Sequence, residues 1–130
     1  MIVSLHVATG AALGALSGSR VGAVVLGVPA HLLGDRIPHQ DIASRRFEIT
    51  SGAACLALLA LRRGPFDSAV IGAAAASAPD LEHVFRAARP GGRKLFHGRL
   101  GWHRAGAFPA AAQLVLAGAI VGYLLAPPRK

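Results

Sequence analysis

Five apolar runs separated by short polar connections most strongly constrain how this chain can fold. Within each run the apolar residues recur at helical spacing, and Gly, Pro and Arg mark the connections. The sequence therefore predicts five helices, over residues 3–17, 21–35, 48–62, 66–79 and 104–126. The first and third connections are short enough to make the flanking helices antiparallel neighbours. We expect an all-α single domain over residues 1–130: a small bundle of about five helices, built from two helical hairpins and a C-terminal hydrophobic helix.

The two predicted hairpins resemble each other when the sequence is offset by 45 residues. At this offset Asp35 falls on Asp80, Gly27 on Gly72, Leu13 on Leu58 and Leu16 on Leu61. The match predicts an internal repeat of residues 1–45 and 46–90. It also places the two aspartates at matching ends of the bundle.

The composition favours a membrane location. Hydrophobic residues make up 53% of the chain and charged residues 15%, and small residues let helices approach closely inside bilayers. Four predicted helices have about 14 to 16 residues, fewer than the roughly 20 that cross a bilayer upright, whereas the run 104–126 is long enough. The sequence therefore predicts a membrane-type helix over 104–126 and a location in the inner membrane. Spanning and partial insertion of the other helices both stay open.

The net charge of +8 favours an anionic partner. The cations are mostly arginines in short segments between apolar runs, where they suit lipid headgroups as well as other phosphates. Nine of the 14 lie at the histidine-bearing end of the bundle, which by the positive-inside bias faces the cytoplasm. We expect membrane lipid and an anionic small-molecule or lipid substrate as partners. Nucleic acid is not expected, because aromatic stacking platforms are absent, and the oligomeric state stays open.

The ionisable side chains gather at one end of the predicted bundle. In an up-down bundle the chain start, the second connection and the fourth connection share one end. All six histidines fall at this end, together with every carboxylate except Asp67. We therefore expect folding to bring Asp35 and Asp80 into one pocket, although they lie far apart in the sequence.

These side chains have the chemistry of a metal site. His31 and Asp35 are four residues apart and project from one face of a helix, and Asp80 and His83 are three apart. Imidazole nitrogen and carboxylate oxygen are ligands of Zn²⁺ and similar divalent ions, so we expect a divalent metal, with zinc as the favoured ion. The candidate ligands are His6, His31, Asp35, His39, Asp80, His83, His97 and His103. The candidate catalytic residues, including a base for hydrolysis, are Glu82, Asp35 and Asp80.

Simpler interpretations exist for each residue taken alone. A single histidine at a helix end is usually a cap or an interfacial polar group, and Asp80 after a proline is also typical of a turn. His97 and His103 fit a basic interfacial loop anchored by Trp102. A buried Asp or His is costly without a partner, so the ensemble favours a functional site. The alternative function is a non-catalytic membrane protein that binds or transports a metal ion or a proton.

The same residues carry a resemblance to a known family. They are His6 and the segments 31–35 (HLLGD), 79–83 (PDLEH) and 97–103. Together they resemble the predicted membrane-bound metal-dependent hydrolases of bacteria, helical inner-membrane relatives of zinc-dependent phospholipases, with Glu82 where that family has Asp. The resemblance implies metal-dependent hydrolysis of a phosphoester or an ester, including one derived from a lipid.

Overall fold

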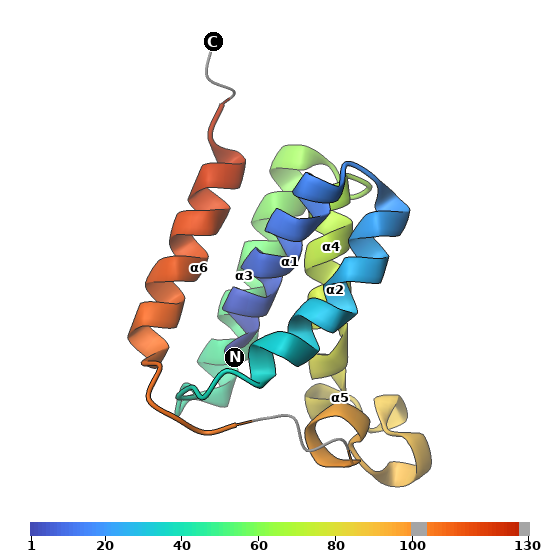
Figure 1. Cartoon of the computed structure of the whole chain (residues 1–130), viewed down its shortest axis with the longest axis vertical. Coiled ribbons are helices and arrows are strands. Elements are labelled where there is room, and N and C mark those ends of the chain that lie inside the picture. Colours follow the sequence, from blue (N-terminus) through green and yellow to red (C-terminus); the bar gives the residue numbers. More distant parts are fainter. Residues whose placement is uncertain (100–103, 128–130) are drawn as a thin grey trace.

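The structure is a computed structural model that describes residues 1–99 and 104–127. These residues form six α-helices (Figure 1): α1 (Val3–Ser17), α2 (Arg20–Asp35), α3 (Arg45–Arg63), α4 (Ser68–Ser77), α5 (Leu81–Val84) and α6 (Ala110–Leu125). Four single helical turns flank α5: η1 (Ala78–Asp80), η2 (Arg86–Ala88), η3 (Pro90–Gly92) and η4 (Leu95–Arg99). Within the described residues no β-strand forms beyond isolated bridges at His39. The predicted all-α bundle is therefore confirmed.

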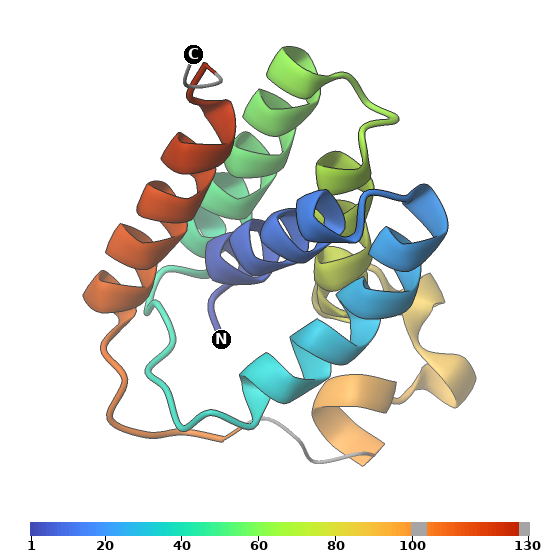
Figure 2. The ribbon, with the colours of Figure 1, turned by 45° about the horizontal axis from the view of Figure 1, so that its top comes forward.

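Helix α1 lies at the centre of the bundle and contacts α2, α3, α4 and α6 (Figure 2). It is apolar around most of its circumference, a pattern typical of a helix that is buried on all sides. The core around it consists mainly of small and branched side chains: Ile2, Leu5, Val7, Ala8, Ala11, Leu59, Ala69, Val70, Ala73, Ala117 and Val121.

Helices α1 and α4 pack backbone to backbone in antiparallel directions. A Cβ atom on Gly10 would lie 2.4 Å from the carbonyl oxygen of Gly72, and one on Gly14 would lie 2.2 Å from that of Ser68. Only glycine permits so close an approach of two helices. The contact places the first turn of α1, which carries His6, beside the last turn of α4.

The segment before α6 crosses the same end of the bundle in an extended conformation. The amide of His39 donates to the carbonyl of Arg104 at 3.1 Å, and the amide of Gly106 donates to the carbonyl of His39 at 2.8 Å. The amide of Arg104 also donates to the carbonyl of Asp35 at 3.1 Å. These bonds tie the segment to the end of α2.

The membrane prediction is wrong. Residues 104–108 pair with the segment around His39, and Pro109 precedes the first turn of α6, so the predicted helix over 104–126 begins only at Ala110. It has 16 residues, fewer than the roughly 20 that a bilayer core requires. Among the described residues no helix combines the length and the apolar character needed to cross a membrane. This finding overturns the predicted membrane-type helix and the inner-membrane location with the site facing the cytoplasm.

Candidate metal centre

The last turn of α2 supplies the central carboxylate of the site. Asp35 is buried, and three imidazoles approach it: His6 Nε2 at 2.9 Å, His97 Nε2 at 3.1 Å and His31 Nε2 at 3.4 Å. The backbone nitrogen of Met1 also donates to it. Burial raises the pKa of Asp35, but the imidazoles of His31, His6 and His97 outweigh burial and hold this pKa well below its usual value. The Asp35 carboxylate is therefore ionised.

His6, from the first turn of α1, is fully buried and stacks on His31 with 3.8 Å between ring centroids. Burial lowers the pKa of His6 to about 3, so the ring is neutral near pH 7. Because a carboxylate can only accept, the single proton of the ring lies on Nε2, which faces Asp35. The other ring nitrogen, Nδ1, is buried without a hydrogen bond and carries a lone pair.

His31 has the opposite proton arrangement. Its Nδ1 donates to the carbonyl oxygen of Ala76 at 2.8 Å, so in the neutral ring Nε2 carries the lone pair. That nitrogen lies 3.4 Å from the Asp35 carboxylate, with no hydrogen bond between them. A cation bound near this nitrogen would stabilise the buried Asp35 carboxylate.

Asp80 follows α4 in the turn η1 and approaches the same point. Its carboxylate lies 3.4 Å from His97 Nε2 and 3.9 Å from His31 Nδ1. Burial raises the pKa of Asp80 to about 6, and its Oδ2 atom is buried without a hydrogen bond. Asp35 and Asp80, far apart in the chain, thus share the neighbourhood of one imidazole.

Glu82 positions His97 rather than facing the cluster. Its carboxylate accepts the backbone N–H groups of Leu95 at 2.7 Å, Phe96 at 3.3 Å and His97 at 2.8 Å, and also the Nδ1–H of His97 at 2.7 Å. These bonds turn His97 Nε2 towards the two aspartates. A carboxylate that orients a histidine from behind is common in metal sites.

His83 lies at the outer side of the cluster, and its ring meets that of His97 edge to face at 4.1 Å. The ammonium of Lys94 donates to His83 Nδ1 at 2.9 Å. Burial, followed by the charges of His97 and Lys94, lowers the pKa of His83 to about 4. This ring is therefore also neutral near pH 7.

The possible donors form three overlapping groups in which the donor atoms lie within 4.8 Å of one another. The groups are His6, His31 and Asp80; His31, Asp35 and His97; and Asp80, His83 and His97. Ligands about 2.1 Å from one ion lie up to roughly 4 Å apart. The donors are therefore close enough to share an ion after small side-chain movements.

One predicted ligand does not join these groups. His39 lies in the connection after α2, where its Nδ1 donates to the carbonyl of Ile37 at 2.7 Å and its Nε2 lies 3.3 Å from Asp41. It belongs to none of the donor groups found among the described residues. His103, like the predicted anchor Trp102, lies outside the described residues.

Sequence reasoning placed Arg45 and Lys94 at the histidine-bearing end of the bundle but did not predict their contacts with His83, and it missed the anchoring role of Glu82. Arg45 is the first residue of α3 and Lys94 comes just before η4, and both contact His83. The one sequence signal that links Glu82 and His97 is that both belong to motifs of the resemblance. The contact itself depends on the path of residues 85–94, which has no periodic pattern.

Comparison with known proteins adds no assignment: no protein-family model, curated protein or solved structure matches this chain.

Proposed function

We propose that this protein is a metal-dependent hydrolase that acts on a phosphoester or an ester through a divalent metal, with zinc as the expected ion. The observation that carries the proposal is the convergence of buried electron-pair donors. His6 Nδ1 and His31 Nε2 are both buried without a hydrogen bond, and Asp35 and Asp80 add two carboxylates beside them. A divalent cation would satisfy all of these atoms.

The donor set fits such an ion. Neutral imidazoles and ionised carboxylates are the forms that bind divalent metals, and His6 is held neutral while Asp35 is held ionised. Glu82 behind His97 and the Ala76 carbonyl behind His31 are the supporting partners that ligating histidines usually have. His6, His31, Asp35, Asp80 and His97 would hold the ion, with His83 at its outer side.

When bound, a divalent ion supplies Lewis acidity towards a phosphoryl or carbonyl oxygen. The residues of the chain do the remaining work. Burial raises the pKa of Asp80 to about 6, and the oxygen of this carboxylate that does not ligate the ion would be the group to accept a proton from water. Both oxygens of Glu82 are occupied by the segment 95–97, so its geometry favours positioning over the predicted role as base.

The resemblance to the predicted metal-dependent hydrolases supports the same reaction class, since their shared motifs include the residues that meet here. The internal repeat also belongs to this proposal. Asp35 and Asp80 occupy equivalent positions at the 45-residue offset, and both approach His97 Nε2. Two copies of a hairpin would thus each contribute one carboxylate to a shared site.

Metal analysis of the purified protein tests the proposal. We expect about one Zn, Mn or Fe ion per chain, lost with the hydrolysis of generic phosphoesters and esters in Asp80→Ala. Asp41→Ala removes a largely exposed carboxylate outside the donor groups and should keep the metal. Metal without turnover would support a non-catalytic metal-binding protein instead. Failure of the wild-type chain to bind any of these ions would contradict the proposal.

A further inference from the structure

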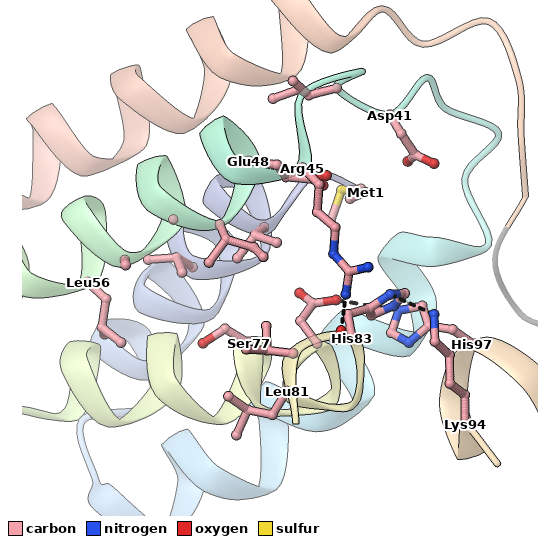
Figure 3. Close-up of a pocket in the computed structure, with 18 residues that line it drawn as sticks. Met1, Asp41, Arg45, Glu48, Leu56, Ser77, Leu81, His83, Lys94 and His97 are labelled. Atoms are coloured by element: carbon pink, nitrogen blue, oxygen red, sulfur yellow. Dashed lines mark hydrogen bonds and ion pairs between the residues drawn. The ribbon is translucent and has the colours of Figure 1, made fainter. Parts of the chain in front are cut away.

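A cavity of about 490 Å³ opens beside the metal centre, between α1, α3 and the turns that follow α4. Figure 3 shows His83, His97 and Lys94 at one end of it and Leu56 at the other. Its volume lies in the range of cavities that bind small molecules. The two ends differ in chemistry, so a ligand with one polar and one apolar end would bind in a single orientation.

The end next to the metal centre is rich in cations. Arg45 donates to the carbonyl of His83, and Lys94 donates to Nδ1 of the same residue. Arg89 binds the neighbouring carbonyl of Glu82 at 2.7 Å. Burial lowers the pKa of Lys94, and the charges of Arg89 and Arg45 lower it further. In the part of the chain that the structure describes, these three cations form no ion pair with a carboxylate.

Such a cluster is stabilised by an added oxyanion. Arginine and lysine together are the usual recognition elements for phosphate, with arginine supplying paired donors and lysine a point charge. Asp41 and Glu48 also line the cavity, but the Asp41 side chain is largely exposed and burial raises the pKa of Glu48. Neither carboxylate pairs with Arg45 or Lys94.

The other end of the cavity is apolar. Its walls come from α1 and α3, and the lining residues there are Val3, Val7, Ile49, Gly52, Ala53 and Leu56. Ile49 and Leu56 are two turns apart on α3, about 10 Å at the rise of an α-helix. This length suits an alkyl chain of medium length.

We propose that this cavity binds an amphiphilic phosphoester, with the phosphate between the metal centre and the pair Arg45 and Lys94, and the alkyl chain along α3 towards Leu56. The inference rests on the proposed function and narrows its substrate class to phosphate esters of apolar alcohols. The phosphate of such a ligand would face Arg45 and Lys94, which form no ion pair with a carboxylate of the described residues. Its alkyl chain would face the valine and isoleucine side chains at the other end of the cavity.

Binding of n-alkylphosphonates of two to eight carbons tests the proposal. Their carbon–phosphorus bond resists hydrolysis, so calorimetry measures binding separately from turnover. Each buried methylene contributes about 0.8 kcal/mol, so affinity should rise about fourfold per added carbon until the cavity is full. Inorganic phosphate, which has no alkyl chain, should bind more weakly than every phosphonate of the series. An alkyl alcohol of equal length should bind at least tenfold more weakly than its phosphonate.

Two kinds of variant separate the ends of the cavity. Arg45→Ala and Lys94→Ala should each weaken all phosphonates about tenfold or more while keeping the dependence on chain length. Ala53→Phe places a ring in the apolar end and should abolish that dependence. Ala54→Phe is the matched control, because Ala54 is exposed on the same helix and does not line the cavity.

The outcomes distinguish this inference from the proposed function. Metal-dependent hydrolysis with a flat chain-length series, or with equal binding of alcohols and phosphonates, overturns the substrate class and leaves the hydrolase intact. A chain without metal overturns the proposed function, and the phosphonate series then still reports on the cavity alone. Equal effects of Ala53→Phe and Ala54→Phe would place the alkyl chain outside this cavity and contradict the inference.

Discussion

At the residue scale, Glu82 shows how one buried side chain can set the direction of another. Its two oxygens hold three successive backbone N–H groups and the ring of His97. Burial raises the pKa of Glu82, but the hydrogen bonds from His97, Leu95 and Phe96 lower it below its usual value, so the carboxylate is ionised. The segment carrying His97 thus depends on a single negative charge for its local order.

Replacing that charge should loosen the segment. In Glu82→Gln the amide NH₂ group faces donors, so at least one of the four bonds is lost and the others weaken. We expect the free energy of unfolding to fall by about 2 to 3 kcal/mol in urea titrations, since hydrogen bonds to charged groups are worth roughly 1.5 to 3 kcal/mol. The imidazole NMR signals of His97 should also shift. Asp41→Asn, at a largely exposed carboxylate, should change stability by less than about 1 kcal/mol.

A purely structural role for Glu82 would predict the same loss of stability but no loss of metal affinity. Removal of a group that orients a ligating histidine typically weakens metal binding about 10- to 100-fold. Unchanged metal affinity in a folded Glu82→Gln protein would therefore contradict the positioning role.

Local spacing predicted the residues of the site better than their partners. The four-residue spacing of His31 and Asp35 placed both at one helix end, and the two do meet in the structure. His39 also follows the same helix, so the sequence predicted it as a ligand. In the structure its segment pairs in an extended conformation with residues 104–108, and His39 belongs to none of the donor groups of the described residues. That pairing depends on backbone hydrogen bonds between distant segments, and no side-chain pattern predicts it.

At the element scale, the site depends on the close contact of α1 and α4. Connection lengths predicted hairpins of sequential helices, but they could not predict that α1 would become the central helix. That choice comes from glycines on facing surfaces, which allow two backbones to meet. The same contact aligns His6 with the end of α4, so packing of these helices and assembly of the site are one event.

Alanine at this contact should therefore disrupt both. Gly10→Ala would force a methyl group to 2.4 Å from the carbonyl oxygen of Gly72, and the helices must separate. We expect a loss of about 1 to 3 kcal/mol in unfolding free energy, as for other overpacked cores, together with weaker metal binding. Gly118→Ala on α6 is the control, because a Cβ there meets no atom within 4 Å. It should be neutral or stabilising by up to about 1 kcal/mol. Equal stability of the two variants would show that α1 and α4 are not in tight contact.

At the scale of the whole molecule, composition misled the prediction more than pattern did. Several large apolar side chains are exposed in the structure, among them Leu16, Leu61 and Tyr123, which are 83%, 83% and 78% exposed. Their presence raised the apolar content to a level that suggested a membrane protein. The helix lengths argued the other way, and the late start of α6 after Pro109 removed the one run that seemed long enough. The all-α fold class was predicted from the helical spacing of apolar residues. That spacing does not depend on whether the additional apolar side chains are buried or exposed.

Metal binding should stabilise the entire fold, because the donors come from α1, α2, η1 and η4. An ion at 100 times its dissociation constant adds about 2.7 kcal/mol to the free energy of unfolding. Thermal unfolding with and without zinc should therefore show a higher Tm with the ion, reversed by a chelator. The gain should shrink as pH falls through the pKa values of His97 and Asp80. Burial lowers the pKa of His97, but the carboxylates of Asp35, Glu82 and Asp80 outweigh it, so this pKa is raised. Burial raises that of Asp80 to about 6.

The sign follows from competition between protons and the ion. Below these pKa values the native state without metal holds protons on His97 and Asp80, and the ion must displace them to bind. Lower pH therefore weakens metal binding, and the full gain is present only above the raised pKa of His97. Asp80→Asn removes one of the two competing protons and one ligand charge, so its gain should be smaller at pH 7 and should depend less on pH. A zinc-induced rise in Tm that is the same at pH 5 and pH 7.5, or that is undiminished in Asp80→Asn, would place the ion elsewhere on the molecule.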